Sequence, residues 1–242
     1  MLHFQVMKFS HIFLFLFFLL SSPMLSYHHQ FLMVQSAEQL YTKQLVAAIN
    51  HRFLGVPLKD NGLFGQDIGA NVGYDLKLGL SSNQIVSYSS ASTYSQQSLI
   101  YKKSFSLKEK IWTGGAIHFD MLTLTTQENT TLSYTLFGAY VSESIDIAVN
   151  TIYKDYFSSI QMGFATAFRV IPKTKLFLEY LTPIKSYAEY GVFISGVKLM
   201  TFGHNFYLFL SNQNDVGYIP ASSGSDENQL YSGFKIERIF DF

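Results

Sequence analysis

Catalysis in this chain would depend first on three histidines that stand beside polar or aromatic residues. The motifs are His51-Arg52-Phe53, His118-Phe119-Asp120 and His204-Asn205-Phe206. A serine hydrolase needs its histidine base within hydrogen-bond reach of the nucleophile, and a short His-x-Ser pair would supply both. None of the three motifs carries the serine, although strand pairing can bring a distant serine beside a histidine. We interpret the histidines as structural residues and do not expect an enzyme.

The chain carries no motif for a cofactor or a metal ion. The His-Glu-x-x-His zinc motif, the phosphate-binding loop and the dinucleotide-binding fingerprint are absent from the sequence. Because the chain has no cysteine, it can form neither a thiolate metal site nor a disulfide framework. We therefore expect no cofactor and no metal.

A larger set of charged residues stands at alternating positions within apolar stretches. In a strand such residues share one face, because successive side chains point to opposite sides. Exposing Arg or Lys to the middle of a bilayer costs about 2–4 kcal/mol in a membrane barrel, so we expect this face to line a lumen. The predicted lumen-lining residues are Arg52, Asp75, Lys77, His118, Asp120, Asp146, Arg169, Glu179, Lys235 and Glu237.

The elements that must position these charges are strands. Residues 68–80 alternate strictly, with aliphatic or aromatic residues at even positions and Gly, Asn, Asp or Lys at odd positions. Similar alternation recurs along the chain and predicts twelve antiparallel strands, although the count could be ten or fourteen. They lie near 45–54, 68–80, 84–90, 96–105, 109–121, 131–141, 145–153, 158–170, 174–182, 190–200, 204–212 and 229–242.

The connections between these segments alternate in length. After every second segment the turn is tight, as at 81–83, 106–108, 142–144, 171–173 and 201–203, whereas most of the others are longer, above all 55–67 and 213–228. Short turns at one rim and long loops at the other are typical of an all-β, up-and-down barrel of a bacterial outer membrane. Both chain ends would then lie on the periplasmic side.

The last strand and the first residues indicate export to that membrane. Phe234, Ile236, Phe240 and Phe242 share one face, and a strand that ends on a bare aromatic residue is a signal for the barrel-insertion machinery of Gram-negative bacteria. At the other end, Lys8 precedes a nine-residue apolar run at 12–20, which is too short to span a bilayer but fits the apolar region of a signal peptide. We expect a signal peptide at 1–36 and a barrel at 37–242; an uncleaved anchor is the alternative.

Composition limits the partners of the chain. The 17 basic and 17 acidic residues cancel, so there is no basic excess that would indicate nucleic acid. Aromatic residues are frequent, with 23 Phe and 16 Tyr. Beyond the leader no apolar run approaches the ~18 residues of a membrane helix. The remaining alternatives are a secreted β-sandwich and a membrane barrel, and the number and spacing of the strands favour the barrel.

Several segments resemble an uncharacterised family of exported outer-membrane barrel proteins. The similarity runs through a P-K-T turn, a strand with a glutamate and a G-H-x-F hairpin, at 168–180, 191–198, 201–206 and 209–212, and includes 49–53 near the start. The resemblance implies an outer-membrane barrel. It implies no activity, because the family has none to transfer.

The lumen-lining charges carry the functional hypothesis. Both signs occur in similar numbers, which argues against a strongly ion-selective pore. The leading hypothesis is a narrow channel of low selectivity for small solutes, with outer-membrane lipid and the insertion machinery as its other partners. The rival is a non-conducting barrel, filled by ion pairs, whose long loops dock a partner. Twelve strands lie between the eight that side chains fill and the sixteen that leave an aqueous channel. A lipid-modifying enzyme is the least favoured.

Overall fold

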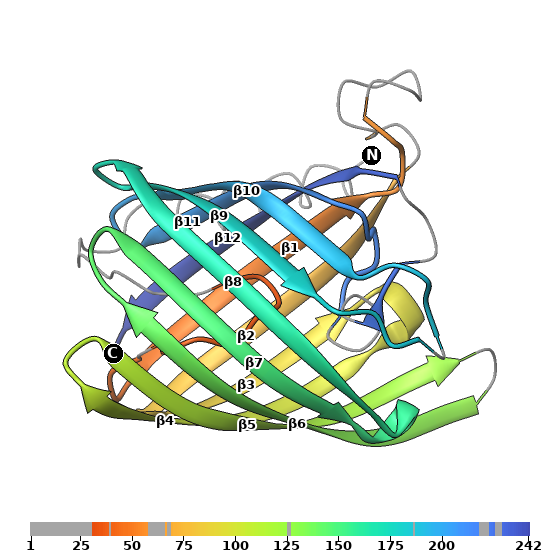
Figure 1. Ribbon diagram of the computed structural model, residues 1–242, viewed down its shortest axis with the longest axis horizontal. Coiled ribbons are helices and arrows are strands. Elements are labelled where there is room, and N and C mark those ends of the chain that lie inside the picture. The colour runs from red at the N-terminus through yellow and green to blue at the C-terminus, as the bar shows by residue number, and fades with distance from the viewer. Residues whose placement is uncertain are drawn as a thin grey trace, which may run out of the picture.

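The chain forms a closed antiparallel barrel of twelve strands in a computed structural model (Figure 1). The strands are β1 (Gln44–Phe53), β2 (Ala70–Ser81), β3 (Gln84–Ala91), β4 (Gln97–Lys108), β5 (Ile111–Leu124), β6 (Gln127–Val141), β7 (Ile145–Lys154), β8 (Ser159–Ile171), β9 (Thr174–Leu181), β10 (Val192–Met200), β11 (His204–Ser211) and β12 (Tyr231–Asp241). The structure describes residues 31–38, 40–57, 66, 69–124, 127–185, 187–217, 223–225 and 229–242.

Each strand pairs with its neighbours in sequence, and β1 pairs with β12 to close the wall. The closing register runs from Gln44 opposite Asp241 to Arg52 opposite Gly233. Closure leaves no free sheet edge, so every strand finds hydrogen-bond partners on both sides, as a hydrocarbon environment requires. The predicted all-β barrel and its count of twelve strands are confirmed.

One tight turn lies elsewhere than predicted. The sequence places a turn at 106–108, but β4 continues to Lys108 and the turn is Glu109–Lys110. The pairing of β4 with β5 shifts register between Ser106 and Lys108. Such an irregularity interrupts the alternation that marks a strand, which explains the early end of the predicted segment.

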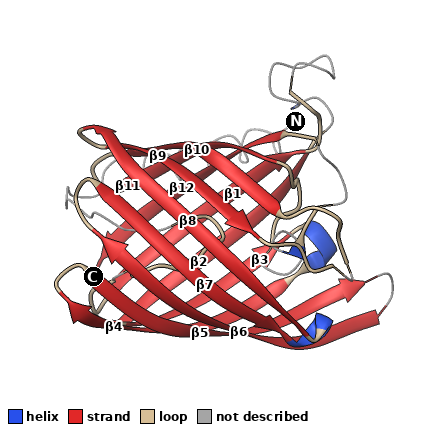
Figure 2. Ribbon diagram, viewed as in Figure 1, coloured by secondary structure: helices blue, strands red, loops and turns tan. Residues whose placement is uncertain are grey.

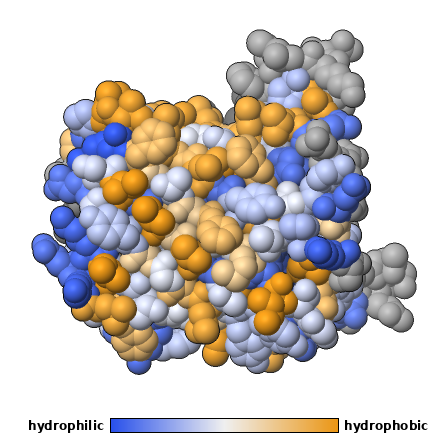
Figure 3. Space-filling view, in the orientation of Figure 1, coloured by the Kyte–Doolittle hydropathy of each residue, from blue (hydrophilic) through white to orange (hydrophobic). Residues whose placement is uncertain are grey.

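The wall separates two faces with opposite chemistry. Strand β7 alternates at every residue, with Ile145, Ile147 and Val149 exposed and the residues between them buried. Across the outer surface in Figure 3 apolar side chains gather over the middle of the wall, and strongly hydrophilic ones gather toward its ends. An apolar band of this kind is the surface that a membrane barrel presents to lipid.

The two ends of the barrel also differ. The tight turns and the C-terminus lie at one end, whereas two 3₁₀ turns, Thr93–Ser95 and Asp155–Phe157, lie in connections at the other (Figure 2). The longest connections, 54–69 and 212–230, belong to this second end. Within the described ranges, no helix is long and apolar enough to cross a membrane.

Candidate functional site in the lumen

The predicted lumen-lining residues lie on the inward face of the wall. Eight of them are at most 8% exposed: Arg52, Lys77, His118, Asp120, Asp146, Glu179, Lys235 and Glu237. Asp75 is partly exposed and pairs with Lys235. Arg169 lies at the tight-turn rim, where it pairs at 3.6 Å with Glu143, whose side chain is 89% exposed. Arg169 is therefore a rim residue in this structure.

Ion pairs along the inward face join neighbouring parts of the wall. Lys175 of β9 lies 2.5 Å from Asp146 of β7. Lys235 of β12 contacts Asp75 of β2 at 3.2 Å and Glu237 at 3.1 Å. Glu237 also accepts hydrogen bonds from the Tyr207 hydroxyl (3.0 Å) and the Asn205 amide (3.3 Å). The two pairs between different strands join strands two apart, so these pairs line the wall and do not bridge the lumen.

Sequence reasoning missed four inward lysines: Lys102, Lys154, Lys175 and Lys198. Strand alternation could have found them. Lys154 has the same parity as Asp146 in β7, and Lys175 has the same parity as Glu179 in β9.

The centre of the lumen is filled by residues 31–38, which we call the lumen segment. This irregular stretch, drawn in red inside the barrel in Figure 1, precedes β1. The backbone N–H groups of Leu32, Met33 and Val34 donate to the Glu179 carboxylate at 2.6, 2.7 and 2.9 Å. Successive amides that converge on one carboxylate form an anion nest, and hydrogen bonds to a charged acceptor are among the stronger ones.

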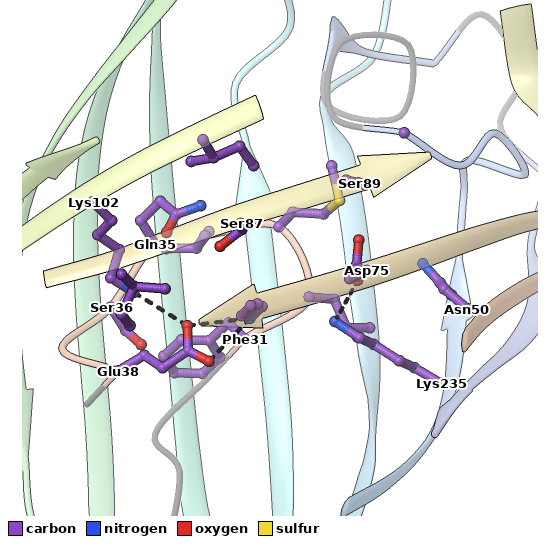
Figure 4. Close-up of a pocket in the computed structure, with 17 residues that line it drawn as sticks. Phe31, Gln35, Ser36, Glu38, Asn50, Asp75, Ser87, Ser89, Lys102 and Lys235 are labelled. Atoms are coloured by element: carbon purple, nitrogen blue, oxygen red, sulfur yellow. Dashed lines mark hydrogen bonds and ion pairs between the residues drawn. The ribbon is translucent and has the colours of Figure 1, made fainter. Parts of the chain in front are cut away.

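Two further wall contacts hold the lumen segment. Gln35 exchanges hydrogen bonds with the Asn150 side chain of β7, donating its N–H at 2.6 Å and accepting at its carbonyl at 2.8 Å. Glu38 pairs with Lys77 of β2 and Lys102 of β4 (Figure 4). The lumen segment thus binds the walls formed by β2, β4, β7 and β9.

Apolar side chains of the lumen segment pack against the part of the wall formed by β5 through β11. Phe31, Met33, Val34 and Ala37 pack in a cluster with inward residues of β5 through β11. Gly163 of β8 lies next to this cluster, because a Cβ atom added there would make an ordinary contact of 3.4 Å with Cγ2 of Val34. Burying a Phe, Met or Val side chain contributes about 1.5–3 kcal/mol, so the apolar contacts add substantially to the polar ones.

The position of the lumen segment bears on the expected leader. The sequence predicts that residues 31–36 belong to a signal peptide, and in the structure they lie inside the barrel. The reason is that these residues have both apolar side chains for the cluster and backbone amides for Glu179. Residues 1–30 lie outside the described ranges, and cleavage of a signal peptide stays a prediction.

At the end with the long loops, the β11–β12 connection folds over the barrel. Arg52 donates to the Gln213 carbonyl at 3.1 Å, and Lys154 contacts the Ser223 hydroxyl at 3.2 Å. Burial raises the pKa of the Asp215 carboxyl, and the nearby Arg52 charge acts against that rise. The rival hypothesis assigned 213–228 to partner docking, but its described residues, 213–217 and 223–225, lie mostly buried against the barrel. Most of 55–67 lies outside the described ranges.

A small cavity remains between the lumen segment and the wall. It has a volume of about 110 Å³ and lies beside β1 to β4 and β12 (Figure 4). Its polar lining comes from Gln35, Ser36 and Glu38 of the lumen segment and from Asn50, Asp75, Lys77, Ser87, Ser89, Lys102 and Lys235 of the wall. A cavity of about 10–15 Å³ by the same measure holds one water, so this space has room for several waters.

The histidines occupy three different settings. His51 stacks on Phe234 on the outer face, with ring centroids 4.7 Å apart, and His204 contacts Arg238 at 2.8 Å. His118 lies directly opposite Ser133 in the β5–β6 pairing, so strand pairing does bring a serine beside a histidine. Both residues are fully buried in the lumen wall, which leaves a substrate no access to them here. Among the described residues, no cluster of His, Asp or Glu is arranged to hold a metal.

The sequence matches no protein-family model and no curated protein. Solved structures do match. KdgM porin aligns with 81% of this chain and 99% of its own at a TM-score of 0.55, and NanC porin with 82% and 99% at 0.54; both are 8% identical. Outer membrane phospholipase A from Escherichia coli aligns with 90% and 96% at a TM-score of 0.49 and 12% identity.

At these identities the likeness to KdgM and NanC shows the fold alone. The barrel resembles those of bacterial outer-membrane proteins, which the P-K-T turn and the G-H-x-F hairpin had implied. The particular uncharacterised family that these motifs suggested is not confirmed.

Proposed function

We propose that the protein is an outer-membrane channel of low selectivity for small solutes, that signal-peptide cleavage falls before Phe31, and that the lumen segment, retained in the mature chain, holds the channel closed. The twelve-stranded wall, its apolar outer band and its inward charges of both signs support this proposal. A lumen wall that carries both cationic and anionic side chains does not strongly favour the passage of either cations or anions.

One observation carries the proposal: a separate, irregular segment fills the lumen. The wall ion pairs join strands on the same side of the barrel, whereas Glu179, Asn150, Lys77 and Lys102 reach the lumen segment instead of one another. The segment is not part of the sheet and its polar contacts can be exchanged for water, so it can leave without breaking the wall, at the cost of exposing its apolar cluster. A lumen blocked only by wall side chains would have no such movable part.

Single-channel recording of the purified, refolded protein tests the proposal. We expect infrequent, small conductance steps in a planar bilayer, with a modest preference for anions under a KCl gradient. The wall carries charges of both signs, but the four additional inward lysines make its cations outnumber its acids when the segment moves. Compact gel mobility before boiling would establish that the protein is folded. Silence from folded and inserted protein would contradict the channel and favour the rival, a non-conducting structural barrel.

The terminal aromatic strand supports the proposed location. Phe242 is 77% exposed, and Phe234, Ile236 and Phe240 lie at alternate positions on the same outward face of β12. We propose that the insertion machinery recognises this strand. Deleting Phe242 is expected to lower the amount of heat-modifiable protein in the outer-membrane fraction severalfold, while refolding in detergent stays efficient because the side chain has few contacts. Unchanged amounts of the deletion variant in the outer-membrane fraction would show that Phe242 is not part of the insertion signal.

A further inference from the structure

The Glu38 carboxylate occupies a site formed by two lysines of the barrel wall. Its Oε1 lies 3.0 Å from Nζ of Lys77, and its Oε2 lies 3.1 Å from the same nitrogen and 3.3 Å from Nζ of Lys102. All three side chains are at least nine-tenths buried. The acid belongs to the lumen segment, whereas the two cations belong to β2 and β4. The acid is thus the part of this site that can leave.

The surroundings of the two lysines favour an anion in this place. Lys102 lies near Lys77, and Glu38 is the acid that both ammonium groups contact among the described residues. Lys235, which also lines the cavity, is already paired with Asp75 and Glu237. If Glu38 moved away, Lys102 and Lys77 would both lose the acid that they contact, and Lys77 would keep only the more distant charge of Glu237. Unpaired buried charge is strongly unfavourable, so a replacement anion would bind.

The cavity beside Glu38 gives such an anion room and hydrogen-bond partners. It is about 110 Å³ in volume, and Asn50, Ser87, Ser89 and the Asp75–Lys235 ion pair line it together with the two lysines (Figure 4). Asn50 and the two serines supply neutral donors and acceptors next to the two positive charges. A solute of a few heavy atoms with one carboxylate fits both the charge and the size of this space.

We propose that Lys77 and Lys102 form a binding site for small carboxylates, which Glu38 occupies while the lumen is closed. In the open state a carboxylate solute takes the place of the Glu38 side chain. Passage of that solute rests on the proposed channel function. Binding at the two lysines does not depend on the channel function, because it requires only that the carboxylate of Glu38 be absent.

Chemical rescue of Glu38→Ala tests the site. The substitution leaves a carboxylate-sized space beside Lys77 and Lys102, so the temperature at which the barrel loses its compact gel mobility should fall. Acetate should restore it in a saturable manner, by about 4 °C at tenfold the dissociation constant, while acetamide and chloride at equal concentration should not. Glu143→Ala is the matched control, since it removes an exposed acid, and it should respond to none of these solutes.

A second, triple variant shows whether the effect of acetate requires the two lysines. In Glu38→Ala with Lys77→Gln and Lys102→Gln, the buried cations are gone, so baseline stability should recover and the acetate effect should vanish. Equal rescue by acetamide, or rescue that persists without the lysines, would overturn the site. If acetate binds as expected while no variant conducts ions, the site stands and the channel function fails.

Discussion

Replacing Glu179 with alanine is expected to open the barrel to ions. The substitution removes the acceptor of three backbone hydrogen bonds from Leu32, Met33 and Val34. Hydrogen bonds to charged groups contribute about 1.5–3 kcal/mol each, and water recovers part of that when the amides are released. A net loss of about 3 kcal/mol would shift the closed-to-open ratio roughly a hundredfold. Single-channel recording should therefore show frequent, long openings where the native protein opens rarely.

Two further variants distinguish the loss of the Glu179 contacts with the lumen segment from a general loss of negative charge. Glu179→Gln keeps an oxygen acceptor but loses the negative charge, so its open probability should lie between those of the native protein and Glu179→Ala. Glu143→Ala removes an acid whose side chain is 89% exposed at the rim, and its openings should match the native ones. Native-like gating of folded Glu179→Ala would show that this carboxylate does not hold the segment.

The wall of the barrel was largely predictable from the sequence. Lipid on one side and a polar or packed lumen on the other impose a strict two-residue period, as in β2 and β7. Prediction was poorest where the period is interrupted. The irregular pairing between Ser106 and Lys108 displaced one turn, and β6 begins at Gln127, four residues before its predicted start.

The filling of the lumen was not predictable in the same way. Glu179 was assigned to the inward face, but its partners are backbone amides, which every residue except proline possesses. No side-chain pattern identifies such donors. Residues 31–34 are also apolar like the residues of a leader. Their composition therefore indicates a signal peptide and not a segment packed inside the barrel. The pairing of Glu38 with two lysines is an intermediate case. Its acidic and basic residue types are visible in the sequence, but only the fold shows that they lie within contact distance.

Cross-linking the lumen segment to the wall is expected to abolish conduction. A Cβ atom at Gly163 would lie 3.4 Å from Cγ2 of Val34, and the sulfur atom of Val34→Cys can take the position of that Cγ2. Val34→Cys combined with Gly163→Cys is therefore expected to join the segment to β8. The native chain has no cysteine, so the bond that forms is the designed one. Gly163→Cys alone is the control for the added side chain and for the reductant.

The most direct measurement is a recording of this double variant in one bilayer before and after a reductant is added. Our account predicts silence in the oxidised state and the return of native-like openings after reduction, with no change in the Gly163→Cys control. Equal conduction in both states would contradict it, because ions would then pass without movement of the segment. Silence in both states, from protein shown to be folded and inserted, would equally contradict a channel that the lumen segment closes.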